Sequence, residues 1–283
     1  MAPFLVTPPS VPGGAGHDAS QQLLRRFNVH LVGTGPQTLL FCNGFSCSQQ
    51  VWRYLMPMLA AHYRLVFFDQ VGTGGADPAA YDAQRHGSFK GYAQDIVAIC
   101  QALDLREVVL VGHSAGAIMG LLAANEAPHH FAKAVLLTAS PCYLNEPGYF
   151  GGFERQQVLD LLAAMHDDYE NWAASFAQML VGQDYSPSLG YELAGYFCRS
   201  NAVIAERLAY LTFLGDNRAD VPHLRLPTLL LHCSDDVAVP PQVAEYLHAH
   251  LPDATLVTLA ATGHCPHLSA PREVYAAIRS FLA

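Results

Sequence analysis

VVLVGHSAGAIMG, at residues 108–120, is the segment from which the architecture of this chain follows. Its first four residues are apolar, as in a buried strand, and its last residues are typical of a helix. Between them, Gly112-His113-Ser114-Ala115-Gly116 matches G-x-S-x-G, a tight turn that exposes a serine between a strand and a helix. Small residues at positions 112 and 116 let neighbouring backbone pass close to the turn. The segment therefore predicts an α/β fold with Ser114 as a nucleophile.

Short apolar runs on both sides of this segment extend the alternation of strand and helix. Each run is apolar on both faces and is bounded by Gly, Asp, Ser or Pro, which is typical of buried parallel strands. Helical patterns such as GYAQDIVAICQALDL lie between them, so we expect a mostly parallel sheet flanked by helices. The expected strands are residues 38–42, 64–69, 108–111, 134–138, 228–232 and 255–259.

One long segment interrupts the alternation. From about residue 141 to 222 the pattern is helical, with Trp172, Phe176 and Leu180 recurring every four residues. The segment is rich in aromatic residues, so we expect a helical lid over an apolar pocket, inserted in one domain of residues 21–283. Residues 1–20 are rich in Pro and Gly and are expected to form a flexible N-terminal tail.

Composition excludes several classes of function. Fifteen Lys and Arg stand against 24 Asp and Glu, for a net charge of −9, which repels nucleic acid and anionic membrane surfaces. No apolar run is long enough to span a membrane. The seven cysteines are scattered and odd in number, which favours free thiols in the cytoplasm. Ligand spacing for a metal and the full G-x-G-x-x-G of a nucleotide site are both missing, so no metal or cofactor is expected.

A serine nucleophile needs a base and an acid, which in this type of fold follow it in the order Ser, Asp or Glu, His. The loop after the expected strand 255–259 supplies His264 as the base, and His267 is a weaker candidate because it lies past Pro266. The loop after strand 228–232 carries Asp235 and Asp236. Adjacent carboxylates do not both point inward, so the residues alone leave the choice of acid open.

Two backbone N–H groups are expected to stabilise an oxyanion beside the serine. The N–H of Ala115 lies at the start of the helix that follows Ser114. The second N–H comes from the loop after strand 38–42, where Gly44 lets the backbone turn and Phe45 can donate.

In these residues the chain resembles the RsbQ-like α/β-hydrolase family of bacterial stress-signalling hydrolases, which is related to the plant strigolactone and karrikin receptors. The resemblance runs from about Asn28 to the C-terminus. It rests on VGHSAGA at 111–117 and, more specifically, on SPCYLNEPGYFGGFE at 140–154 and GHCPHLS at 263–269.

The resemblance implies a role for each site residue. The triad falls on Ser114, Asp236 and His264, and Asp236 is preferred to Asp235 because the family's acid precedes a three-residue spacer and a proline, here Pro240. The oxyanion donors fall on Phe45 and Ala115. The substrate pocket is formed by aromatic residues, namely Phe45, Tyr143, Phe153, Trp172, Phe176 and Phe213.

Two functions fit these residues. The first is a serine hydrolase for a small apolar ester or lactone that senses this ligand for a regulatory protein partner, such as a PAS-domain phosphatase. The second is a metabolic carboxylesterase or lactonase without a signalling partner. A haloperoxidase or carbon–carbon hydrolase is a more distant alternative. An intact triad serves each of them, so the sequence does not separate them.

Overall fold

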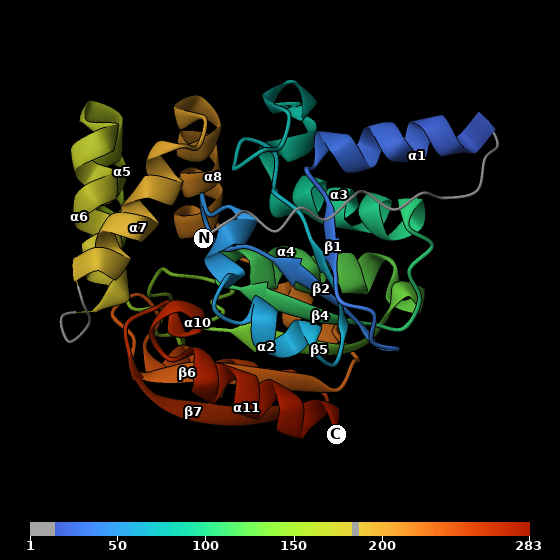
Figure 1. The fold of residues 1–283 in the computed structure, drawn as a ribbon. Helices are drawn as coiled ribbons and strands as arrows, with labels where there is room; N and C mark the ends of the chain where they lie inside the picture. Colours follow the sequence, from blue (N-terminus) through green and yellow to red (C-terminus); the bar gives the residue numbers. More distant parts are fainter. Residues whose placement is uncertain (1–14, 183–186) are drawn as a thin grey trace.

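Seven strands form one sheet in the order β1-β3-β2-β4-β5-β6-β7 (Figure 1). A computed structural model describes residues 15–182 and 187–283. The first strand, β1, runs antiparallel to β3, and all other neighbours are parallel. The six expected strands and the mostly parallel sheet are confirmed. The strands are β1 His30–Val32, β2 Thr38–Cys42, β3 Arg64–Phe67, β4 Val108–His113, β5 Phe131–Leu137, β6 Thr228–Asp235 and β7 Ala254–Thr262.

The central strands are held by burial on both faces. Every residue of β2 and β4 is buried, and the register places Leu40 of β2 beside Leu110 of β4 and Val66 of β3. Apolar β-branched and leucine side chains of this kind pack well on both sides of a parallel sheet. The most buried part of the core therefore lies directly behind the segment that carries Ser114.

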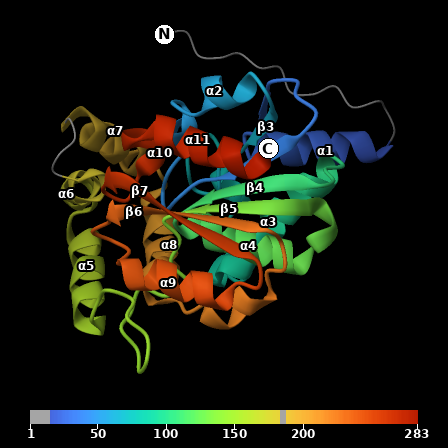
Figure 2. The same ribbon diagram turned by 90° about the horizontal axis from the view of Figure 1, so that it is seen from below.

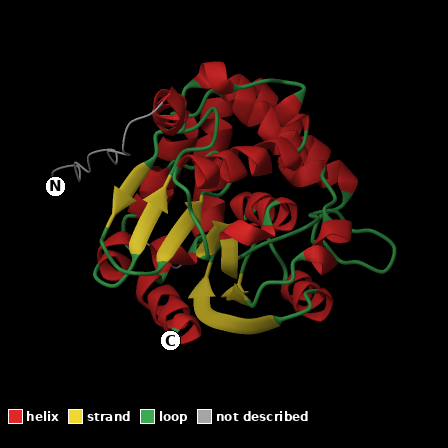
Figure 3. Ribbon diagram, turned by 90° about the vertical axis from the view of Figure 1, so that its right-hand side faces the viewer, coloured by secondary structure: helices red, strands yellow, loops and turns green. Residues whose placement is uncertain are grey.

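Helices cover both faces of the sheet (Figures 2 and 3). One face carries α2 and α11, and the opposite face carries α3, α4 and α9, as Figure 2 shows. Helix α3 buries a stripe of Tyr92, Ile96 and Ile99, whereas α4 is buried on nearly every side because it packs between α3 and the strands β2, β4 and β5. These helices are α2 Met56–Ala60, α3 Phe89–Ala102, α4 Ala115–Glu126, α9 Pro241–His250 and α11 Pro271–Leu282, with the short α10 at Pro266–Ser269.

Four helices are inserted between β5 and β6: α5 Arg155–Asp167, α6 Tyr169–Val181, α7 Pro187–Cys198 and α8 Ala202–Leu214. They stand together at one end of the sheet (Figure 1). Side-chain caps define the starts of α6 and α8, because Asp168 accepts from the N–H of Asn171 and Asn201 accepts from that of Ile204. The helices lie within the expected range of residues 141–222. We call α5–α8 the helical insertion.

The N-terminal boundary differs from the expectation. Helix α1, Ala15–Arg26, includes residues 15–20, which were expected to belong to the flexible tail, and residues 1–14 lie outside the described part. Leu24 of α1 and the following Phe27 are buried, and α1 packs near α3. The helix is stabilised because its apolar side packs against the rest of the domain, near α3. Across residues 15–182 and 187–283, no helix is long and apolar enough to cross a membrane.

Candidate active site

Ser114 lies at the sharp turn between β4 and α4. Its backbone has φ 53° and ψ −123°, a conformation that is rare for a residue with a side chain and marks strain at a functional turn. The glycines around it are needed for space. A Cβ on Gly112 would lie 2.5 Å from the Cα of Ala117, and one on Gly116 would lie 2.1 Å from the carbonyl oxygen of Asn43. The expected close passage of backbone at positions 112 and 116 is confirmed.

The structure brings Ser114, His264 and Asp236 together. His264 Nε2 lies 2.8 Å from Ser114 Oγ, and its Nδ1 lies 2.9 Å from Asp236 Oδ2. The side chains of His264 and Asp236 are 4% and 0% exposed, so their interaction is shielded from water. Asp236 Oδ1 also accepts the N–H groups of Ala238 and Val239, at 2.9 and 3.1 Å. These bonds fix the carboxylate behind the imidazole.

Asp235 is placed differently from its neighbour. It is exposed, and its backbone carbonyl accepts the N–H of Gly263 at 2.7 Å. It therefore supports the loop that carries His264 without bringing its own carboxylate to the imidazole. The alternative base, His267, is fully buried below the site, and neither of its ring nitrogens has a hydrogen-bond partner among the described residues.

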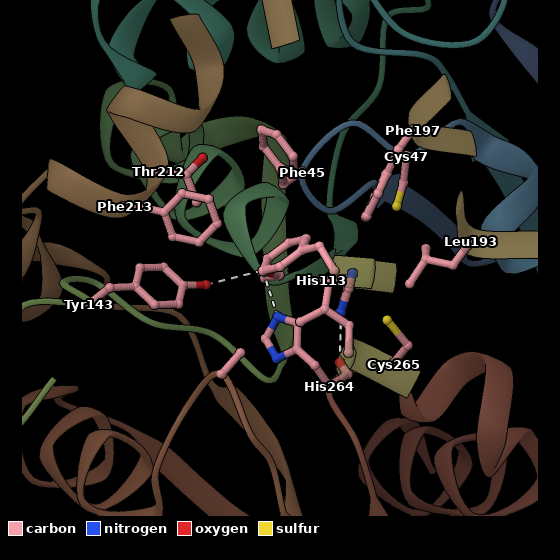
Figure 4. A pocket seen from close by; sticks show the side chains of 14 residues that line it. Phe45, Cys47, His113, Tyr143, Leu193, Phe197, Thr212, Phe213, His264 and Cys265 are labelled. Carbon is pink, nitrogen blue, oxygen red and sulfur yellow. Dashed lines mark hydrogen bonds between the residues drawn. The ribbon is translucent and has the colours of Figure 1, made fainter. Parts of the chain in front are cut away.

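The hydrogen bonds define which atoms carry protons. Asp236 can only accept, so His264 Nδ1 carries a proton and Nε2 accepts the Ser114 hydroxyl. The Tyr143 hydroxyl, 3.2 Å from Ser114 Oγ, must then donate to that oxygen. Burial raises the pKa of Tyr143, so its phenol stays protonated. Figure 4 shows Tyr143 and His264 directed at the same point.

Phe45 and Ala115 frame the other side of Ser114. Ala115 is the first residue of α4, so its N–H has no acceptor within the helix. Phe45 precedes Ser46, whose φ of 50° turns the loop after β2. Neither N–H takes part in a backbone hydrogen bond within the described residues. Both are thus available to a ligand.

An apolar cavity lies against Ser114 and His264 (Figure 4). Four of the six expected pocket residues line it: Phe45, Tyr143, Phe176 and Phe213. The free volume of about 20 Å³ holds roughly one water molecule, because these aromatic side chains nearly fill the space. The wall also contains residues that the sequence analysis did not assign to the pocket, namely Cys47, His113, Leu180, Leu193, Phe197, Thr212, Ala238 and Cys265.

Phe153 and Trp172 do not line the cavity, contrary to the expectation. The Trp172 ring stacks on Phe176, with centroids 4.7 Å apart, and Phe153 lies behind Tyr143 at 6.5 Å. Both support wall residues. The four-residue spacing of Trp172 and Phe176 continues to Leu180, and the same spacing separates Leu193 from Phe197. This spacing was the available signal for the missed residues, but it does not tell the cavity side of a helix from its packed side.

The helical insertion is bonded directly to the loop of His264. The N–H of His264 donates to the carbonyl of Leu180 in α6, at 2.6 Å. A Cβ on Gly263, whose φ is +80°, would lie 2.2 Å from the carbonyl oxygen of Val181. Only glycine fits this approach, so the end of α6 and the His264 loop form one packed unit.

Known proteins place the chain in a family. Residues 39–278 match the alpha/beta hydrolase family. A karrikin insensitive 2 receptor (CA) of Petunia hybrida is 36% identical, with 86% of this chain and 91% of the receptor covered. A strigolactone esterase of Arabidopsis thaliana is 34% identical, with 93% and 99% covered. The structure of a hydrolase from Oleispira antarctica superimposes with a TM-score of 0.91 at 31% identity, covering 93% of this chain and 97% of that one. The chain belongs to the alpha/beta hydrolase family.

Proposed function

We propose that this protein is a serine hydrolase that acts on a small apolar ester or lactone through Ser114, His264 and Asp236. The observation that carries the proposal is the 2.8 Å contact between Ser114 Oγ and His264 Nε2 at the wall of an apolar cavity, with Asp236 bonded behind the imidazole. A serine hydroxyl becomes a useful nucleophile when a base of this kind takes its proton.

The reaction follows from the positions of the protons. His264 Nε2 takes the Ser114 proton while Oγ attacks the carbonyl carbon and forms a C–O bond. The N–H groups of Phe45 and Ala115 stabilise the resulting oxyanion. The intermediate breaks its bond to the leaving alkoxide, which takes the proton from His264. Water then attacks the acyl-serine by the same route and releases a carboxylic acid; the alcohol of a lactone stays attached to the acyl group.

The lining of the cavity supports the choice of substrate class. Within residues 15–182 and 187–283, the lining includes the rings of Phe45, Phe176 and Phe213 and no Lys, Arg, Asp or Glu. A charged acyl group would lose its hydration there without gaining a partner. We therefore expect small uncharged acyl groups or lactones to be preferred over charged substrates.

We further propose that the protein senses its ligand for a regulatory protein, as an RsbQ-like member of its family. Two observations support this. Relatives at 34–36% identity carry the names of a karrikin receptor and a strigolactone esterase. Helices α6, α7 and α8 also contribute Phe176, Leu193 and Phe213 to the wall of the cavity, so a bound ligand contacts the helical insertion directly and can bias its position. A PAS-domain phosphatase is the kind of partner that we propose.

The thiols support a cytoplasmic location as part of this proposal. All seven cysteines are free, and six of them are buried; Cys198 is exposed. Reduced thiols persist in the cytoplasm, where small-molecule reductants oppose disulfide formation.

The first experiment tests the chemistry. A fluorophosphonate probe should label wild-type protein at Ser114, and Ser114→Ala should lose both the label and the hydrolysis of p-nitrophenyl butyrate, by about 10³–10⁶-fold. Circular dichroism should show that the variant is folded. A folded variant that keeps a tenth of the activity would remove Ser114 from the reaction.

The second experiment separates ligand sensing from metabolic hydrolysis. The purified PAS-domain phosphatase of the same cell would be titrated with the hydrolase by calorimetry, before and after a butyrolactone-type ligand is added. Sensing requires an affinity that changes with the ligand and a turnover slower than the enzyme median of about 10 s⁻¹. Unchanged affinity together with a kcat/KM near the diffusion ceiling of about 10⁸ M⁻¹s⁻¹ would support the metabolic esterase instead.

A further inference from the structure

The backbone of His264 is fixed on both sides by hydrogen bonds. Its N–H donates to the Leu180 carbonyl at 2.6 Å. Its carbonyl accepts two bonds, one from His113 Nε2 at 2.9 Å and one from Thr138 Oγ1 at 3.0 Å. A histidine whose two flanking peptide groups are held in this way has little freedom except rotation of its own side chain.

His113 is the only one of these partners that comes from the serine turn itself. It is the last residue of β4 and directly precedes Ser114, and its side chain is buried. The bond from its ring to the His264 carbonyl therefore joins the residue beside the nucleophile to the residue that carries the base. Figure 4 shows the His113 ring beside His264, at the edge of the cavity.

The surroundings of His113 fix its ring and its tautomer. Its ring packs against that of His267, with centroids 4.3 Å apart, and a Cβ on Gly44 would lie 2.4 Å from Nδ1. Nδ1 has no hydrogen-bond partner in the described part of the chain. Burial, and secondarily His264, lower the pKa of His113 to about 3, so the ring is neutral. Because a carbonyl can only accept, the single proton resides on Nε2.

We infer that His113 is a positioning residue for the reaction: its Nε2–H holds the His264 carbonyl so that the His264 imidazole meets Ser114 Oγ. The inference rests on the proposed function and deepens it. It also explains why the loop that supplies Phe45 has a glycine at position 44, since any side chain there would push the His113 ring away from the carbonyl.

Two substitutions separate the hydrogen bond from the ring. His113→Phe keeps a buried ring of similar size and removes the donor, whereas His113→Gln removes the ring and keeps a donor at the position of Nε2. Displacement of a catalytic group by about 1 Å costs on the order of 10²-fold. We therefore expect His113→Phe to lower kcat by about 10–100-fold with little change in KM, and His113→Gln to restore most of the loss.

A matched control is available in His130. This histidine is also buried and also bonds a backbone carbonyl, that of Leu105 at 2.6 Å, but it does not line the cavity. His130→Phe should lower the melting temperature as His113→Phe does, without lowering kcat. Thr138→Val removes the second donor to the His264 carbonyl with little change in volume, and it should lower kcat about 3–10-fold with KM unchanged.

The experiment measures kcat and KM with p-nitrophenyl butyrate for wild type and these four variants. Loss of kcat in His113→Phe, rescue by glutamine and no loss in His130→Phe support the inference. If the wild type is active and folded His113→Phe keeps full kcat, the inference is overturned and the proposed function is not. If His113→Phe does not fold, full kcat in Thr138→Val overturns the inference in the same way. A wild type that hydrolyses no ester overturns the proposed function as well.

Discussion

The carboxyl edge of the sheet and the helical insertion meet at Ser114, and they contribute different kinds of residue. Ser114, Asp236 and His264 follow β4, β6 and β7, and each is held by hydrogen bonds to neighbouring backbone or side chains. The insertion contributes apolar side chains such as Phe176 and Phe213, which contact one another through their rings. The proposed function thus assigns reactivity to the core and selectivity to the insertion, and it predicts that substitutions in the two regions have separable effects.

The largest effect is expected for the acid in the core. Asp236→Asn keeps the shape of the side chain but removes the charge that orients His264 and stabilises its protonated form. We expect kcat for p-nitrophenyl butyrate to fall by about 10³–10⁴-fold with the fold intact. Steady-state kinetics and circular dichroism would measure both.

Asp235→Asn is the matched control, one position away. Its carboxylate is exposed and its backbone carbonyl, which bonds Gly263, survives the substitution. We expect less than a threefold change in kcat. If Asp235→Asn were the more damaging of the two, the acid would belong to the neighbouring residue.

The core was predictable because its signals are local. A buried strand followed by a G-x-S-x-G turn specifies the position of Ser114 within five residues, and the loops after β6 and β7 specify where to look for an acid and a base. The choice of Asp236 over Asp235 could not be made from residue type, because both are carboxylates in the same loop. In the structure the backbone N–H groups of Ala238 and Val239 bind the Asp236 carboxylate and fix it behind His264.

The sequence predicted that the insertion is helical but not which of its side chains line the cavity. The spacing of Trp172 and Phe176 identifies one side of α6. The Trp172 ring nevertheless packs against Phe45 and Phe197 and stacks on Phe176, and it does not line the cavity. Contacts between helices far apart in sequence decide how each helix is rotated. The sequence analysis missed β1 and α1 for a similar reason. Strand β1 is short and α1 is amphipathic, and both are stabilised by tertiary packing.

A change in the insertion should alter selectivity and leave the chemistry intact. Phe176→Leu removes part of a ring from the cavity wall next to Ser114. We expect the ratio of kcat/KM for p-nitrophenyl hexanoate to that for the acetate to rise about tenfold, since each methylene that fits contributes about 1–3 kcal/mol. The kcat for acetate should stay within about threefold of wild type.

Phe150→Leu provides the control for this prediction. Phe150 lies between β5 and α5, is 50% exposed and does not line the cavity. The chain-length preference should not change. Equal shifts in both variants would mean that the chain-length preference follows general stability and not the cavity wall, and the separation between the two regions would fail.

The smallest effect concerns acid stability, and it too should separate the regions. Burial, and secondarily His113 and His264, lower the pKa of His267 well below its ordinary value of about 6.5. Below that pH the unfolded chain binds a proton at His267 and the folded chain does not, so stability is present above about pH 6.5 and is lost as the pH falls. The loss is at most about 1.4 kcal/mol per pH unit for each such histidine.

Urea unfolding of wild type and His267→Phe at pH 7, 6 and 5 measures this loss. The phenyl ring fills the same buried position beside Trp52, whose ring centroid is 4.6 Å from that of His267, and it has no proton to gain. The free energy of unfolding of the variant should therefore fall less steeply as the pH is lowered, whatever its value at pH 7. The difference in slope should approach that of one bound proton, about 1.4 kcal/mol per pH unit. His166→Gln, in the insertion, removes a histidine whose side chain is 70% exposed and should leave the slope nearly unchanged, because exposed pairs such as His166–Glu206 contribute little. Equal slopes for wild type and His267→Phe would show that the acid sensitivity does not arise in the core beneath the site.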